Sequence, residues 1–353
     1  MYKHVLVDYR AHVFRGGECA FCVNALPTTS PPTYYLPNRL IALEEHAVSP
    51  SLEAELLASG FNSHNPPGLL EKLKDVGTGR IADMDAGNLS LQVLAQLSAL
   101  GSDDPEGCRK ANDAIKSAID ANPSRFAGFA VLPMATPNEA AVELERSVTK
   151  LGFKGAMIWN HLKDGTYYDA ARFDPVFATA QKLNVPIYLH PASPTQEIFA
   201  KLFAGNYDAR AAGQISTGSF GWHIDVGTHV LRLYAAGHFV RFPKLKLIIG
   251  HNGEGLPMFI DRIDSTGLRN DTKFDKVWKT NIWTTTSGFF TVRQFQQLRQ
   301  VSPIERIMYS IDYPLSSATE GWAFIMKLAE SKILTKKEMD KFAYRNAEEL
   351  LKL

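Results

Sequence analysis

The sequence contains few cysteines, and this scarcity limits the kinds of protein that it can encode. Three cysteines in 353 residues cannot form a disulfide framework, so we expect a reducing, cytoplasmic environment. Cys19 and Cys22 form a C-x-x-C pair, but a structural zinc site needs two further ligands nearby. A thioredoxin-like motif would occupy a different strand–helix setting. We therefore assign no role to this pair.

The sequence also lacks a long apolar run and an excess of charge of either sign. No stretch approaches the ~20 apolar residues of a membrane span. The N-terminal MYKHVLVDYRAHVF carries charged residues where a signal peptide would be uniformly apolar. Lys and Arg number 38 and Asp and Glu number 37, a balance that argues against a nucleic-acid or membrane partner. With 45% hydrophobic and 21% charged residues, the composition is that of a soluble globular protein.

Short apolar runs alternate with longer amphipathic stretches along most of the chain. This alternation predicts βα units and a parallel sheet. Eight strands, each mostly followed by a helix, indicate an α/β fold, a (β/α)₈ TIM barrel. An open doubly wound sheet, which would bind its ligand at one crevice, is the alternative. The runs expected to form strands are residues 41–46, 91–97, 126–132, 153–158, 186–190, 245–250, 281–286 and 306–311.

Other segments define the expected domain organisation. Residues 1–39 include the Pro- and Thr-rich PTTSPPTYYLP and are expected to form an N-terminal arm or linker, in which His12 has only a packing role. Residues 40–353 are expected to form the barrel. Residues 48–79 are predicted to be a long loop with one short helix over the barrel mouth. Residues 334–353 are predicted to form a closing amphipathic helix.

The first predicted strand ends in three ionisable residues, in the sequence IALEEH. Side chains alternate faces along a strand, so Glu44 and His46 should point the same way and Glu45 the opposite way. At the C-terminal end of a barrel strand, the shared direction of the first two is the active-site mouth. A carboxylate and an imidazole at this spacing can form half of a metal site. The alternative interpretation is a solvated strand end.

Three other predicted strands also end in a titratable residue. VPIYLHP ends its apolar run at His190, LKLIIGHNGEG at His251 and RIMYSIDYP at Asp312. One histidine in such a place is more often a satisfied structural residue than a ligand. Four strand ends of this kind would all converge on one barrel mouth, where packing alone does not explain them.

Taken together, these motifs resemble those of a known family. IALEEH, YLHP, IIGHNGEGLP followed by DRID, and SIDYP are similar to the non-hydrolytic branch of the amidohydrolase superfamily. This branch contains metal-dependent ortho-hydroxybenzoate decarboxylases such as γ-resorcylate and 2,3-dihydroxybenzoate decarboxylase. THVLRLYAAG and NPSRFAGFAVLP also resemble that family, and the resemblance extends from about Leu40 to the C-terminus.

The resemblance implies one divalent metal ion in the active site. The implied ligands of this ion are Glu44, His46, His190 and Asp312. The implied catalytic residues in the pocket around it are His251, Glu254 and Arg262, with Asp312 also taking part in catalysis. Two imidazoles and two carboxylates suit Zn²⁺, and carboxylate-rich sites with waters suit Mn²⁺ or Mg²⁺. We favour Mn²⁺ or Mg²⁺, because chelation of a bidentate substrate needs more than four coordination positions.

The implied activity is decarboxylation of a small aromatic acid that carries an ortho-hydroxyl group. In this scheme Asp312 would protonate the ring carbon, and His251 would bind the substrate oxygens. A metal-dependent hydrolase of an amide, ester or lactone is the alternative, and a barrel with only a binding or structural role is a third. Ala192 and Leu315 depart from the family pattern, which leaves the ring substituents open. We expect a homodimer or homotetramer.

Overall fold

The computed structural model describes residues 34–59, 61, 65–97 and 100–353. Most of the predicted arm, with His12, Cys19 and Cys22, lies outside the described residues. The boundary predicted between residues 39 and 40 stays a prediction. In the part of the chain that the structure describes, no helix has both the length and the apolar character needed to cross a membrane.

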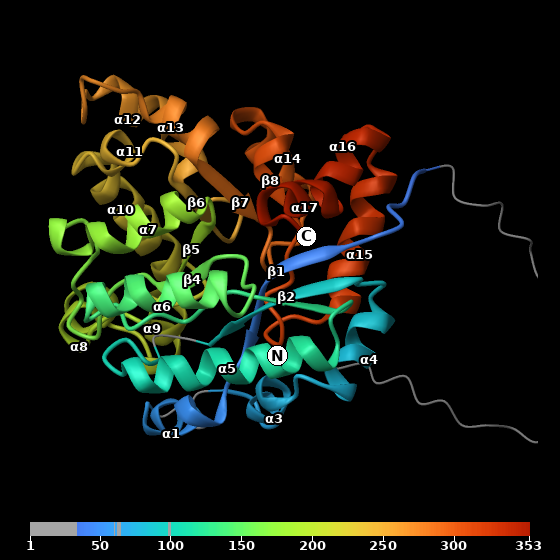
Figure 1. Cartoon of the computed structure of the whole chain (residues 1–353). Helices are drawn as coiled ribbons and strands as arrows, with labels where there is room; N and C mark the ends of the chain where they lie inside the picture. The colour runs from blue at the N-terminus through green and yellow to red at the C-terminus, as the bar shows by residue number, and fades with distance from the viewer. Residues whose placement is uncertain (1–33, 60, 62–64, 98–99) are drawn as a thin grey trace, which may run out of the picture. The chain divides into compact units, whose positions relative to one another are not determined.

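Each of the eight predicted strand segments overlaps a strand. The strands form two parallel groups, β1-β2-β3 and β4-β5-β6-β7-β8 (Figure 1). Parallel bridges between Ala130 and Ala156 and between Glu45 and Tyr313 join the groups at both seams, so the strands form a ring. The (β/α)₈ barrel is therefore confirmed, and the open sheet is excluded. The strands are β1 Ile41–Ala47, β2 Leu91–Gln96, β3 Phe126–Gly128, β4 Ala156–Trp159, β5 Pro186–His190, β6 Lys246–Ile249, β7 Ile282–Thr285 and β8 Ile307–Met308.

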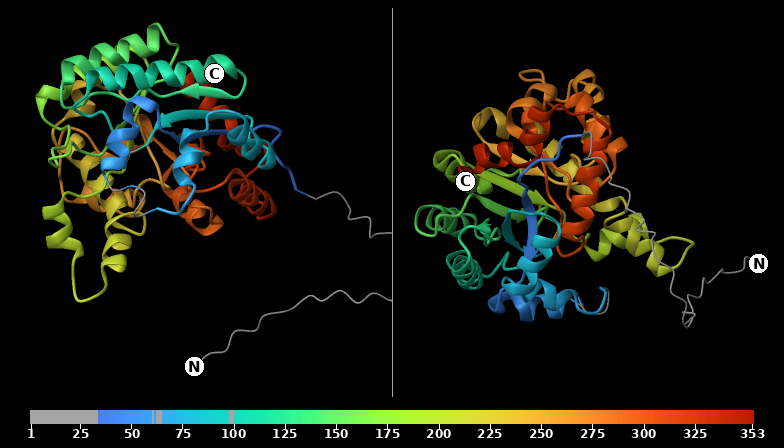
Figure 2. Two further views of the ribbon diagram at one scale, coloured as in Figure 1. Left: turned by 90° about the horizontal axis from the view of Figure 1, so that it is seen from below. Right: turned by 90° about the vertical axis from the view of Figure 1, so that its right-hand side faces the viewer.

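Helices lie around the outside of the strands (Figure 2). Pro105 and Pro137 stand in the first turns of α5 and α6, where a proline loses no intrahelical hydrogen bond. The main helices after strands β2 to β5 are α5 Pro105–Ala121, α6 Pro137–Thr149, α7 Asp174–Leu183, α8 Gln196–Ile198, α9 Ala209–Ser216 and α10 Gly221–Ala235. Those that follow are α11 His238–Arg241, α12 Ile260–Ser265, α13 Phe274–Asn281, α14 Val292–Val301 and α15 Ala318–Glu330.

One prediction about the helices was wrong in detail, and another was confirmed. The segment expected to be a loop with one short helix contains α1 Pro50–Ala58 and α3 Leu69–Lys74, and it leads into α4 Thr78–Ala86. The buried leucines of α1 and α3 lie in one apolar cluster with residues of α5, which explains why this segment is helical. The expected closing helix is present, and it runs without a break through α16 Lys336–Asp340, a π-helical turn Lys341–Arg345 and α17 Asn346–Leu351.

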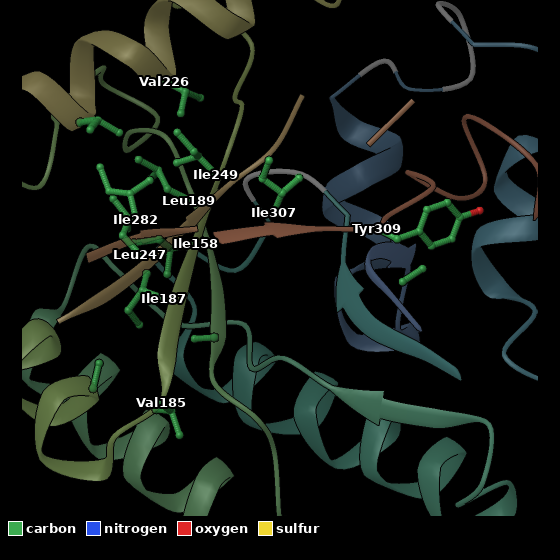
Figure 3. Packing of buried hydrophobic residues seen from close by; sticks show 14 of the residues in the cluster. Ile158, Val185, Ile187, Leu189, Val226, Leu247, Ile249, Ile282, Ile307 and Tyr309 are labelled. Carbon is green, nitrogen blue, oxygen red and sulfur yellow. The ribbon is translucent and has the colours of Figure 1, made fainter. Parts of the chain in front are cut away.

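The alternation of side chains along the strands produces two apolar layers. Tyr188 and Ile248 belong to the cluster that fills the barrel interior. Their neighbours Leu189 and Ile249 belong to the larger outer cluster and point toward Val226 of α10 (Figure 3). Both faces of each strand are thus buried, as expected for a parallel sheet covered by helices.

Candidate metal centre

An irregularity in β1 determines which glutamate faces the barrel interior. Ile41 and Leu43 belong to the interior cluster, so strict alternation would place Glu45 inside and Glu44 outside. The register with β2 shifts between Ala42 and Glu45, as in a β-bulge. Glu44 therefore joins the interior, where Tyr188 donates a hydrogen bond to it, and Glu45 turns outward. Bulges often redirect side chains next to active sites.

Four of the predicted site residues form one cluster at the C-terminal ends of the strands. Glu44, His46, His190 and Asp312 each place a ligand atom within 4.8 Å of the others. His190 Nε2 lies 3.0 Å from Glu44 Oε1, and His46 Nε2 lies 3.1 Å from Asp312 Oδ1. The first three side chains are buried and Asp312 is nearly so. The predicted convergence of these residues is confirmed.

The cluster contains buried polar atoms that lack a protein partner. Within the described residues, Glu44 Oε1, His46 Nε2 and Asp312 Oδ1 accept and donate no hydrogen bond. Buried polar atoms are nearly always paired, so several unpaired atoms that point toward one another indicate a binding site. Two imidazole nitrogens and two carboxylates are a suitable donor set for Zn²⁺, Mn²⁺ or Mg²⁺. The residues present thus fit a divalent cation.

Surrounding contacts orient the ligand atoms toward the centre of the cluster. Glu44 Oε2 accepts hydrogen bonds from Tyr188 and, at 2.5 Å, from Ser287 Oγ, which leaves Oε1 free. His190 Nδ1 donates to the carbonyl of Pro191 at 2.9 Å, which leaves Nε2 free. Such outer contacts fix the tautomer and orientation of metal ligands.

The pKa values of His46 and Asp312 bear on whether the cluster can bind a cation. Burial lowers the pKa of His46 to about 4, so its imidazole is neutral at pH 7. Burial and the neighbouring Glu44 carboxylate raise the pKa of Asp312 to about 7. A bound divalent cation would favour the ionised carboxylate of Asp312 and lower this pKa again.

His251 lies beside the cluster and is held by Glu254. His251 Nδ1 donates to Glu254 Oε1 at 2.8 Å, and His251 Nε2 lies 3.6 Å from Glu44 Oε1. Burial opposes protonation of His251, but Glu254 and Glu44 outweigh it and raise its pKa to about 10. The predicted proximity of Glu254 is confirmed. His251 can therefore present a protonated Nε2 to a ligand in the site.

The sequence analysis missed His223. This buried residue of α10 places Nδ1 2.7 Å from Glu254 Oε2 and Nε2 2.9 Å from the carbonyl oxygen of Gly218. Glu254 therefore bridges two histidines. No pattern in the sequence marks His223, because it lies inside a helix and not at a strand end.

The structure does not bring Arg262 into the cluster, although the resemblance implied a place in the pocket. Ile260 and Ile263 are the buried residues of α12, and Arg262 is exposed. Within the described residues its side chain forms no hydrogen bond or ion pair with His251 or Glu254.

Aromatic rings line the cluster from two sides. The ring of Trp159, at the end of β4, meets His190 edge-on with a centroid separation of 4.5 Å. Phe289 contacts His251 in the same manner at 5.6 Å. Leu315, which departs from the family pattern, is exposed. The site is therefore a cluster of ionisable side chains with aromatic rings beside it.

Comparisons with known proteins agree with this geometry. A family model described as amidohydrolase matches residues 7–353. The decarboxylase orsB of Emericella nidulans is 41% identical over 331 residues, which cover 89% of this chain and 97% of the relative. The γ-resorcylate decarboxylase of a Polaromonas species is 33% identical over 336 residues, 90% of this chain and 99% of the relative.

A solved structure gives the same result at the level of the fold. It is a dihydroxybenzoic acid decarboxylase from Polaromonas with bound manganese and the inhibitor 2-nitroresorcinol. The two chains are 30% identical, and the match has a TM-score of 0.79 and covers 90% of this chain and 97% of the other. From the family match and these relatives, we conclude that the chain belongs to the amidohydrolase family.

Proposed function

We propose that this protein is a metal-dependent, non-oxidative decarboxylase of an ortho-hydroxybenzoate-type acid. The observation that carries the proposal is the set of unpartnered ligand atoms on Glu44, His46 and Asp312, beside His251. This set lies in a chain whose relatives are decarboxylases.

The centre is proposed to hold one divalent cation, Mn²⁺ or Mg²⁺ in preference to Zn²⁺. Glu44 Oε1, His46 Nε2, His190 Nε2 and an Asp312 oxygen would be its protein ligands. When bound, the cation would be chelated by the carboxylate and ortho-hydroxyl oxygens of the substrate and would neutralise their charge. The manganese in the similar Polaromonas enzyme supports this preference.

Asp312 is the proposed proton donor. Decarboxylation requires a proton on the ring carbon that bears the carboxylate, and this step temporarily removes aromaticity. The ortho-hydroxyl group supplies electron density to that carbon. The bond to the carboxylate then breaks, its electron pair restores the aromatic ring, and CO₂ leaves. The cation opposes protonation of Asp312, but burial and the Glu44 carboxylate favour it, and the negative charge of a bound substrate would favour it further.

His251 is proposed to bind the substrate oxygens. Its Nδ1–H is directed at Glu254, so its Nε2 is directed at the cluster. A protonated Nε2 can donate a hydrogen bond to the negative oxygens of a phenolate or carboxylate. Arg262 is retained as a proposed contributor to catalysis only on the resemblance, because its exposed position supplies no contact to the site within this chain.

The proposed setting is a cytoplasmic homodimer or homotetramer that acts on a small aromatic acid. Large apolar side chains are exposed on the surface, including Met258 at 83% and Phe259 at 51%. Exposed apolar side chains that lie together mark candidate protein–protein contacts. Light scattering on the eluted peak of a size-exclusion column tests the oligomeric state.

The proposed reaction is tested by a panel of ortho-hydroxybenzoates, with metal analysis of the same sample. We expect CO₂ release that depends on the cation, and no release from a benzoate that carries only a para-hydroxyl group. Metal-replete protein that hydrolyses amides, esters or lactones but releases no CO₂ would contradict the proposal and favour the hydrolase alternative.

A further inference from the structure

The seam between β1 and β8 is joined largely by side chains. β8 contains only Ile307–Met308. Beyond it, the backbone N–H of His46 donates a hydrogen bond to the carbonyl of Tyr313 at 2.7 Å. Ser310 Oγ accepts hydrogen bonds from the backbone N–H of Glu44 at 2.7 Å and of Leu43 at 3.3 Å. The proposed ligands from β1 and the proposed ligand Asp312 emerge on the two sides of this seam. Their separation therefore depends on the side chains that join it.

Glu45 is one of these side chains. The bulge turns it away from the cation cluster, and it is fully buried. Its Oε1 accepts from the backbone N–H of Ile311 at 3.0 Å and from Ser310 Oγ at 3.2 Å, and its Oε2 accepts from Gln92 Nε2 at 3.2 Å. The Glu45 side chain thus binds the residue that directly precedes Asp312.

Arg80 of α4 is the second side chain that joins the seam. Its side chain is 0% exposed, and Nη2 donates to the carbonyl of His46 at 2.5 Å. Nε donates to the carbonyl of Asp75 at 2.8 Å. The guanidinium carbon lies 4.4 Å from the ring centroid of Tyr313, the residue that directly follows Asp312. A planar guanidinium can stack and donate at once, which a lysine cannot do.

The backbone of Asp312 requires such support. Its φ of 69° lies in the left-handed region, which is unfavourable for a residue with a side chain. Glu45 holds Ile311 on one side of Asp312, and Arg80 packs on Tyr313 on the other. Arg80 also holds His46, the ligand that faces Asp312 across the seam.

We infer that Glu45 and Arg80 are positioning residues for the cation site. They contact no ligand atom. They set the separation of His46 and Asp312 from the outer side of the barrel wall. This inference rests on the metal site of the proposed function, but not on the identity of the reaction.

The test measures Mn²⁺ affinity of the full-length chain after removal of metal by a chelator. Arg80→Lys and Glu45→Gln are each titrated with Mn²⁺, and the concentration of free Mn²⁺ is measured by electron paramagnetic resonance. We expect each substitution to weaken Mn²⁺ binding by about ten-fold or more, the scale of outer contacts in metal sites. Turnover at saturating Mn²⁺ should also fall, because Asp312 would be misplaced even when the cation is bound.

Arg125→Lys is the matched control. Arg125 also donates to two backbone carbonyls, of Ser90 at 3.1 Å and Leu89 at 3.0 Å, but these precede β2 at the opposite end of the barrel. This variant should lower the melting temperature without changing Mn²⁺ affinity. A merely structural role for Arg80 predicts the same behaviour in Arg80→Lys.

Several outcomes would overturn the inference. Unchanged Mn²⁺ affinity in folded Arg80→Lys would do so for Arg80. Glu45→Gln conserves size, so it supplies the test if Arg80→Lys fails to fold, and unchanged affinity in that variant would overturn the inference for Glu45. Wild-type protein that binds Mn²⁺ but releases no CO₂ would contradict the decarboxylase proposal and leave this inference intact. Wild-type protein that binds no divalent cation would overturn both.

Discussion

His46 Nε2 lies 3.1 Å from Asp312 Oδ1, although the two residues come from opposite ends of the barrel sequence. Neither atom forms a hydrogen bond within the described residues, and both are buried. A neutral imidazole and a carboxylate in this relation are best explained as two ligands of one cation.

Substitution of a proposed metal ligand should have a different effect from substitution of His251. His190→Ala and Asp312→Ala should each abolish activity and remove much of the bound cation, because each deletes a direct bond to it. His251→Ala should retain the cation and lose most turnover. Metal content by plasma mass spectrometry, alongside activity, checks both expectations. A His251→Ala protein without metal would show that the roles are assigned incorrectly.

Cation affinity should depend on pH through Asp312. In the metal-free protein the pKa of Asp312 is about 7, so below pH 7 a cation must displace its proton. Affinity for Mn²⁺ should therefore fall by about ten-fold per pH unit below 7 and level off above it. His46 should not add to this slope above pH 5, since its pKa is about 4. Titrations between pH 5 and 8 would measure the slope, which Asp312→Asn should reduce.

Glu254→Gln should alter the protonation of His251 while the metal remains. Although burial opposes it, Glu254 is the leading cause of the raised pKa of His251, so loss of its charge should lower that pKa. The basic limb of the pH–rate profile should then move to lower pH, and turnover at neutral pH should fall by about 10- to 100-fold. An unshifted profile with normal metal content would argue against a role for protonated His251.

The strand ends explain why the convergence of these residues could be predicted from the sequence. An apolar run that stops at an ionisable residue marks the barrel mouth, and Glu44, His190, His251 and Asp312 were located by this rule. Even there the agreement depended on the bulge in β1, which no residue pattern indicated. Without it, the same alternation rule would have turned Glu44 outward.

The remaining features depend on contacts between distant segments. His223 reaches Glu254 from inside α10, and Tyr188 reaches Glu44 across the barrel interior. Such contacts follow from packing and not from spacing along the chain. Arg262 was placed in the pocket by its sequence motif, but its side chain lies on the surface of this chain.

The most direct test of the central claim is turnover of an ortho-hydroxybenzoate in D₂O by the metal-replete protein. If Asp312 delivers a solvent-derived proton to the ring carbon, the phenol should carry one deuterium at the former carboxylate position and none elsewhere on the ring. High CO₂ should drive the reverse carboxylation. Mass spectrometry and proton NMR would measure the label. Solvent oxygen in the product, with an unlabelled ring and no CO₂, would contradict the account.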